Sequence, residues 1–197
     1  MIHHLWGLLS HPDREWKQID QEHESVQHMY EHHVFILAAV PVVCTFFGTT
    51  QFGWDFGGRE LIRVAPGNAL FLGLGFYALI LGAVALMGQL IHKLARKFPS
   101  RPSKRQCTVF AGYIATPMFL SGLVAVYPLV WLCLLAGVAG LCYTTYLLYV
   151  GIPNFLNISH EEGFILSTST LAAGVLVLEA LLAITVFLWS YGPRLLN

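Results

Sequence analysis

An uninterrupted run of 54 residues, from Gln106 to Ser159, contains no Asp, Glu, Lys, Arg or His. As one α-helix this run would extend about 80 Å at 1.5 Å per residue, whereas the hydrocarbon core of a bilayer is about 30 Å thick. The run therefore predicts two membrane-spanning helices. Tyr127 and Pro128 mark the expected break, because proline cannot continue a helix interior and aromatic side chains favour the membrane interface.

The composition supports an integral membrane protein. Of the 197 residues, 56% are hydrophobic and 11% are charged, against roughly 25% charged in soluble domains. The net charge is zero, which excludes a basic nucleic-acid-binding module, so we expect no nucleic acid partner. The sequence contains no nucleophile with its base, no paired carboxylates and no complete metal site. We therefore expect no enzymatic activity.

The uncharged intervals divide the chain into five expected spans. Residues 34–197 are predicted to form an all-α bundle of five transmembrane helices, because each interval supplies the roughly 20 apolar residues that a crossing helix needs. Residues 1–33 are predicted to form a cytoplasmic segment with an amphipathic interfacial helix. The expected spans are residues 34–54, 69–91, 107–126, 129–151 and 166–192.

Basic residues predict the orientation, since Lys and Arg remain on the cytoplasmic side of a membrane. Six of the eleven lie between the second and third spans: Lys93, Arg96, Lys97, Arg101, Lys104 and Arg105. This loop is expected to be cytoplasmic, which places the N-terminus in the cytoplasm and the C-terminus in the periplasm. Setting the topology is the expected role of the six residues, and contact with anionic lipid or a protein partner is the alternative.

The segment before the first span has a helical pattern. Residues recur on one mostly apolar stripe at spacings of three and four: Trp16, Ile19, His23, Val26, Tyr30 and His33. Ser10 followed by Asp13 resembles a capping box that would begin the helix. The pattern predicts one amphipathic helix that lies at the cytoplasmic interface and leads into the first span, packed either on headgroups or on the bundle.

Histidines are concentrated near the N-terminus, with seven of the nine among the first 33 residues. Glu24, His28 and His32 are spaced i, i+4, i+8 and would share a helix face. Such a face can bind a divalent metal such as zinc, can sense pH, or can simply be polar surface. We expect polar surface and no cofactor, with zinc as the alternative.

Glu179 is the only acidic residue within the expected spans. A charge at the bilayer centre costs at least about 2.5 kcal/mol on insertion scales, so this side chain is expected to face protein. It would lie on a small, polar stripe with Thr168, Ala172, Ala183 and Ser190. Thr116 and Tyr113 in the third span are its expected companions in an intramembrane polar site. A hydrogen-bonded structural carboxyl, a proton or ion relay and a subunit contact are the three hypotheses.

Several segments carry a family resemblance. They are His11-Pro12-Asp13-Arg14-Glu15-Trp16, Ala111-Gly112-Tyr113-Ile114-Ala115-Thr116-Pro117, Tyr127-Pro128-Leu129, Tyr146-Leu147-Leu148-Tyr149 and Gly151-Ile152-Pro153. With these segments the chain resembles the Yip-domain membrane proteins over essentially its whole length. The resemblance implies a five-helix bundle with a cytoplasmic N-terminus, a bacterial inner-membrane location and no established catalytic residue. Eukaryotic members are associated with Rab-type GTPases, and their Asp-Leu-Tyr-Gly-Pro element is absent here.

These observations favour a non-enzymatic, multi-pass inner-membrane protein. We expect an interaction or membrane-organising factor, with the bilayer and an unidentified membrane or cytoplasmic protein as partners. The alternative is a small oligomeric transporter or channel in which Glu179, Thr116 and Pro117 line a path. A homo-oligomer is compatible with both hypotheses.

Overall fold

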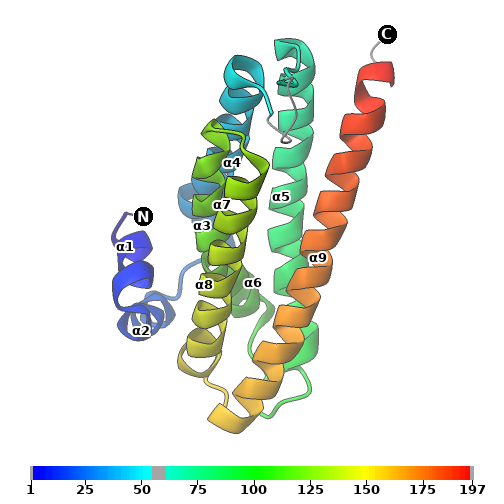
Figure 1. Cartoon of the computed structure of the whole chain (residues 1–197). Helices are drawn as coiled ribbons and strands as arrows, with labels where there is room; N and C mark the ends of the chain where they lie inside the picture. The colour runs from blue at the N-terminus through cyan, green and yellow to red at the C-terminus, as the bar shows by residue number, and fades with distance from the viewer. Residues whose placement is uncertain (1, 55–60, 196–197) are drawn as a thin grey trace.

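The computed structural model describes residues 2–54 and 61–195. The described residues form an all-α fold, which confirms the predicted class (Figure 1). The α-helices are α1 (Ile2–Ser10), α2 (Pro12–Glu22), α3 (Val26–Met29), α4 (Phe35–Phe47), α5 (Pro66–Ala95), α6 (Lys104–Ile114), α7 (Thr116–Ser121), α8 (Val130–Leu156) and α9 (His160–Leu195). Two π-helical turns, Tyr30–Val34 and Gly48–Phe52, flank α4, and a 3₁₀ turn, Gly122–Val126, follows α7.

Five continuous helical runs in the described residues are long and apolar enough to cross a membrane. They are Val26–Phe52, Pro66–Ala95, Lys104–Val126, Val130–Leu156 and His160–Leu188. The first and last runs begin earlier than the charge-free intervals suggested, at Val26 and His160. The observed helices are longer because an uncharged interval marks only the part of a helix inside the hydrocarbon. The same helix continues into the membrane interface, where charged side chains remain hydrated.

Pro117 and Pro128 mark two interruptions of the helices in the third and fourth spans. The third span breaks at Ala115, and the buried Pro117 lies in the first turn of α7. The break predicted at Tyr127 and Pro128 is confirmed, because the 3₁₀ turn ends at Val126 and α8 begins at Val130. Proline fits the first turn of a helix, since the missing N–H is one that has no partner there.

The N-terminal segment folds back onto the bundle. The indole of Trp16 on α2 is fully buried, with its ring centre 4.8 Å from that of Phe110 on α6 and 5.6 Å from that of Phe155 on α8. The hydroxyl of Tyr143, the central residue of α8, lies 3.1 Å from the Leu8 carbonyl oxygen. The end of α1 therefore lies beside the middle of a membrane-spanning helix.

The prediction of one helix running from Ser10 to His33 is wrong. The helix ends at Glu22, His23 is left-handed with φ 46°, and a new helix begins at Val26, capped by the Ser25 hydroxyl. The capping box at Ser10 is also absent, because the Ser10 hydroxyl donates to the Trp6 carbonyl oxygen at the end of α1. Residence of α2 at the membrane surface stays a prediction.

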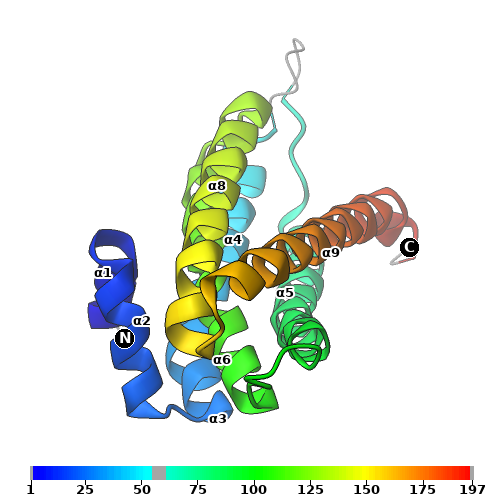
Figure 2. The ribbon, with the colours of Figure 1, turned by 90° about the horizontal axis from the view of Figure 1, so that it is seen from below.

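Helix α9 lies at one side of the bundle, beside α5 (Figure 2). It meets α8 at the loop that joins them and then diverges from it, continuing beside α5 (Figure 2). Its far end, near the C-terminus, lies at the opposite end of the bundle from the loop between α5 and α6 (Figure 1). We call the end that carries this loop, residues 96–103, the basic end.

Alanine substitutions at two glycines of α8, one packed against the N-terminal segment and one not, can measure how tightly that segment is packed. A Cβ atom at Gly151 would lie 2.5 Å from the Phe110 ring and 2.8 Å from the Trp16 ring, whereas a Cβ atom at Gly137 would meet nothing within 4 Å. Gly137→Ala is expected to raise the melting temperature, because alanine is favoured over glycine in a helix by roughly 0.5–1 kcal/mol. Gly151→Ala is expected to lower it, because overpacking costs about 1–3 kcal/mol. Thermal unfolding in detergent measures both, and equal stabilisation by the two substitutions would contradict the packing described.

Candidate functional site

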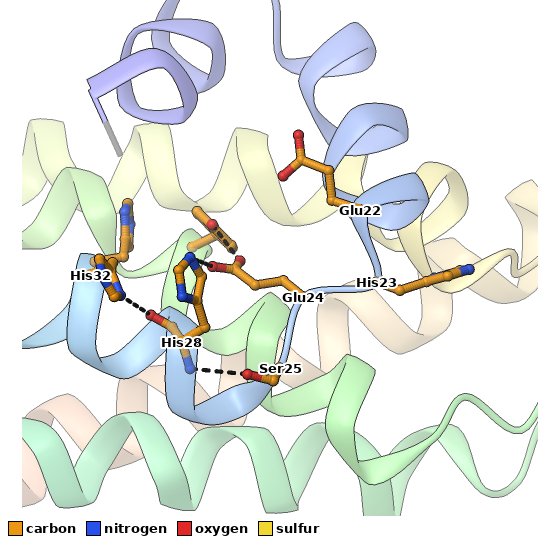
Figure 3. A pocket seen from close by; sticks show the side chains of 8 residues that line it. Glu22, His23, Glu24, Ser25, His28 and His32 are labelled. Atoms are coloured by element: carbon orange, nitrogen blue, oxygen red, sulfur yellow. Dashed lines mark hydrogen bonds and ion pairs between the residues drawn. The ribbon is translucent and has the colours of Figure 1, made fainter.

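A polar cavity of about 420 Å³ lies where the segment between α2 and α3 passes the basic end of the bundle. Its lining residues are Glu22, His23, Glu24, Ser25, His28, His32, His33 and Tyr113 (Figure 3). All but one come from the N-terminal segment, and Tyr113 comes from α6. The cavity is therefore the junction between the N-terminal segment and the membrane bundle.

The junction is fixed by a bond between Glu24 and α6. The Tyr113 hydroxyl donates to the Glu24 carboxylate over 2.6 Å, a distance typical of a charge-assisted hydrogen bond. The preceding residue, Gly112, permits close approach, because a Cβ atom there would lie 2.3 Å from the sulfur of Met29. The adjacent residues Gly112 and Tyr113 therefore hold the start of the first span against the third span.

A second buried bond joins the same two spans. The Nε2 atom of His33 lies 2.8 Å from the Thr116 hydroxyl, and both side chains are at most 2% exposed. The His33 ring also packs on Tyr113, with 4.5 Å between ring centres. Tyr113 and Thr116 therefore bind the N-terminal part of the chain.

The predicted face of Glu24, His28 and His32 does come together, although not as successive turns of one helix. Glu24 lies in the bend before α3, with its carboxylate 3.8 Å from the His28 Nε2 atom. The His28 and His32 rings stack with 4.1 Å between centres, and His32 Nδ1 lies 3.2 Å from the His28 carbonyl oxygen (Figure 3). In this stacked arrangement the nitrogen atoms of the two rings do not converge on a common position where a metal ion could bind.

Among the residues that the structure describes, no group of three His, Cys, Asp or Glu side chains is arranged to hold a metal ion. Zinc binding at Glu24, His28 and His32 stays a hypothesis that rests on their spacing.

The six basic residues of the α5–α6 region, Lys93, Arg96, Lys97, Arg101, Lys104 and Arg105, are all exposed. One of them has a structural role that the sequence did not indicate. The Arg105 guanidinium donates to the carbonyl oxygens of His23 and Glu24, the second over 3.0 Å. Arg105 thereby stabilises the bend between α2 and α3, and the other five lie at the surface of the basic end.

The expectation that Glu179 packs against other spans of the same chain is wrong. Glu179 is exposed, as are Ala172 and Ala183 on the same stripe of α9. The opposite side of α9 packs on α5, where Gly174 adjoins Met87. A helical wheel correctly places these residues on one face, but it does not show which face meets the bundle.

The expected intramembrane site of Glu179, Thr116 and Tyr113 does not form. Tyr113 bonds Glu24, and Thr116 is buried beside His33. Glu179 has no hydrogen bond or ion pair with any residue that the structure describes. A path lined jointly by Glu179, Thr116 and Pro117 is therefore not supported, and neither is the transporter alternative that depended on it.

The Yip1 domain family model matches residues 6–181, which cover the first four spans and most of the fifth. The chain belongs to this family. It is 58% identical over 192 residues to inner membrane protein YohC of Escherichia coli strain K12, covering 98% of each chain. The same protein of Escherichia coli O6:H1 strain CFT073 matches equally well. No solved structure matches the chain.

The Yip1 domain assignment agrees with the five apolar helices and with a multi-pass membrane protein. Neither the family description nor the relatives' printed name denotes an enzyme, and the relatives are named as inner membrane proteins. Gly112 and Tyr113, which lie in one of the segments that carry the family resemblance, are the two α6 residues that contact Met29 and Glu24 in this Yip1 domain protein.

The Glu24–Tyr113 bond can be tested by deleting one hydroxyl. Tyr113→Phe is expected to destabilise the protein by about 1.5–3 kcal/mol, the usual contribution of a hydrogen bond to a charged group. The bend at His23–Ser25 should also become more sensitive to protease, because its Glu24 anchor is lost. Tyr127→Phe is the matched control, since Tyr127 is 61% exposed. Unchanged stability and cleavage in Tyr113→Phe would show that the bond does not fix the junction.

Proposed function

We propose that this Yip1 domain protein is a non-enzymatic organiser of the inner membrane that assembles with a second copy of itself through α9. The observation that carries the proposal is the exposed carboxyl of Glu179 on a membrane-spanning helix. A lipid tail offers no hydrogen-bond partner, so a polar group placed there favours association with another protein surface.

The depth of Glu179 supports this proposal. Gly174 adjoins Met87, and Leu188 adjoins Gly75, so α9 runs antiparallel to α5. Glu179 lies between these two contacts and is level with the middle of α5. The side chain is therefore too deep in the bilayer to reach the headgroup region readily.

A second copy is the partner whose chemistry fits this face. In a two-fold dimer the same patch meets itself, which brings two Glu179 side chains together. Two protonated carboxyl groups can donate to and accept from each other. The exposed neighbours Ala172 and Ala183 are small, and small residues let two membrane helices approach closely.

A photo-crosslinking amino acid at Ala183 tests the dimer in native membranes. We expect a covalent dimer from position 183 and none from Val138, a 59% exposed residue on α8 that serves as control. Glu179→Leu should reduce the dimer at least fivefold, because leucine cannot pair. Glu179→Gln should retain it, because the amide can still donate and accept. Crosslinks to lipid alone at position 183, or a dimer unaffected by Glu179→Leu, would refute assembly through this face.

The basic end is proposed to face the cytoplasm and to meet a cytoplasmic protein or anionic lipid. Five exposed Lys and Arg residues at this end support the orientation, because positive charge is retained on the cytoplasmic side. Arg105 joins this end to the bend between α2 and α3, so the exposed polar residues of that bend, such as His23 and Ser25, lie beside the basic end. The far end of α9 would then lie in the periplasm.

The orientation predicts the behaviour of reporter fusions. A reporter that is active only in the periplasm should be active when fused after Asn197 and silent when inserted near Ser103, between α5 and α6. Immunoblots of both fusions control for expression. An active reporter near Ser103 would reverse the proposed topology while leaving assembly through α9 unaffected.

A further inference from the structure

A cavity of about 230 Å³ lies in the middle of the bundle, where the five membrane-spanning runs meet. Residues contributed by the different runs include Pro41, Ile80, Ala111, Leu148 and Leu178. The lining is apolar except for Thr144 on α8 and Thr170 on α9. An apolar cavity of about 150 Å³ is large enough to bind benzene, so this cavity has room for a ring-sized molecule.

The two threonine hydroxyls in the cavity wall have fully buried oxygen atoms and no hydrogen-bond partner among the described residues. Thr170 as a whole is 1% exposed. Neighbouring threonines on the same helices are satisfied by the carbonyl oxygen four residues earlier: Thr145 donates to Leu141 over 2.8 Å, and Thr168 to Phe164 over 2.9 Å. A buried hydroxyl without a partner is costly and requires an explanation.

The hydroxyls lie within the membrane-spanning runs, and Thr170 is nine residues closer to the start of α9 than Glu179. Thr144 is twelve residues from the end of α8, and Thr170 is ten residues from the start of α9, which corresponds to about 18 and 15 Å along the helix axes from those ends. The hydrogen bond between Tyr149 and Thr168, 2.8 Å long, aligns α8 with α9 so that the two hydroxyls differ in depth by about one helical turn.

The cavity is accessible from the side. The α9 residues Leu178 and Leu181, which line the cavity, are only partly buried, so the cavity is not enclosed along α9. A molecule dissolved in the bilayer can therefore enter beside α9. A single water would have at most the two hydroxyls as partners, the lower limit for an ordered buried water, and it would leave most of the apolar space unfilled.

We infer that this cavity binds a lipophilic molecule with an uncharged carbonyl group, which enters laterally from the membrane. A carbonyl oxygen has two lone pairs and accepts hydrogen bonds from hydroxyl groups such as these. The apolar remainder of the molecule matches the aliphatic and aromatic lining. Quinones with a hydrocarbon tail have this chemistry.

The test uses the full chain in lipid nanodiscs and a decyl-substituted benzoquinone as the probe, with quenching of tryptophan fluorescence as the readout. Wild-type protein is expected to bind about one molecule per chain saturably. Joint substitution of Thr144→Val and Thr170→Val, which keeps the shape and removes both donors, should weaken binding at least tenfold. Thr145→Val is the matched control and should bind normally, because its hydroxyl is already bonded to the Leu141 carbonyl oxygen.

Decylbenzene, which lacks carbonyl groups, is expected to bind at least tenfold more weakly than the quinone. The melting temperature of the double variant controls for folding, and it should equal or exceed that of wild type because two unpartnered hydroxyls are removed. Absence of saturable quinone binding by folded wild-type protein would overturn the inference. Equal affinity of the double variant and wild type for the quinone, or of wild type for the two probes, would also overturn it.

Discussion

Hydrocarbon offers no hydrogen-bond partner to a polypeptide backbone, so a chain that crosses it must satisfy its N–H and C=O groups within helices. The uncharged stretch from Gln106 to Ser159 meets this requirement by forming α6, α7, the 3₁₀ turn and α8. Its interruptions occur where the cost is small: Pro117 is buried in the first turn of a new helix, and Pro128 lies between helices. The positions of α6 and α8 in turn provide the surface on which Trp16 and the N-terminal segment pack.

Polar side chains in this bundle fall into three groups according to how their hydrogen bonds are satisfied. One group is paired within the chain, as in Glu24–Tyr113 and His33–Thr116, and these pairs join the N-terminal part of the chain to the third span. The hydroxyls of Thr144 and Thr170 are buried without a described partner. Glu179 is exposed on α9. Since each unpaired polar group in a membrane favours a partner, we propose a small molecule for the central cavity and a second protein copy for the outer face of α9.

The sequence predicted the five spans because the absence of charge directly reflects the cost of placing charge in lipid. Periodicity was less informative in the N-terminal segment. Trp16 and Ile19 do share a buried face of α2, but the pattern continued past His23, where a left-handed residue ends the helix. The bonds that hold this bend join residues more than eighty positions apart in the chain, such as Arg105 with Glu24. Neither residue spacing nor helix propensity can predict such long-range contacts. The same is true of the orientation of Glu179, which is decided by how α9 packs against α5.

Gly112 and Tyr113, which lie in a segment that carries the family resemblance, each have a physical role in the structure. Gly112 allows Met29 to contact the α6 backbone, and Tyr113 reaches the carboxylate of Glu24. A side chain at the first position would displace α3, whereas loss of the hydroxyl at the second would release the bend that precedes it. The two positions therefore act on adjacent parts of the same junction. The Yip1 domain match begins at residue 6 and so includes Trp16, whose packing on Phe110 and Phe155 makes the N-terminal segment part of the same membrane fold.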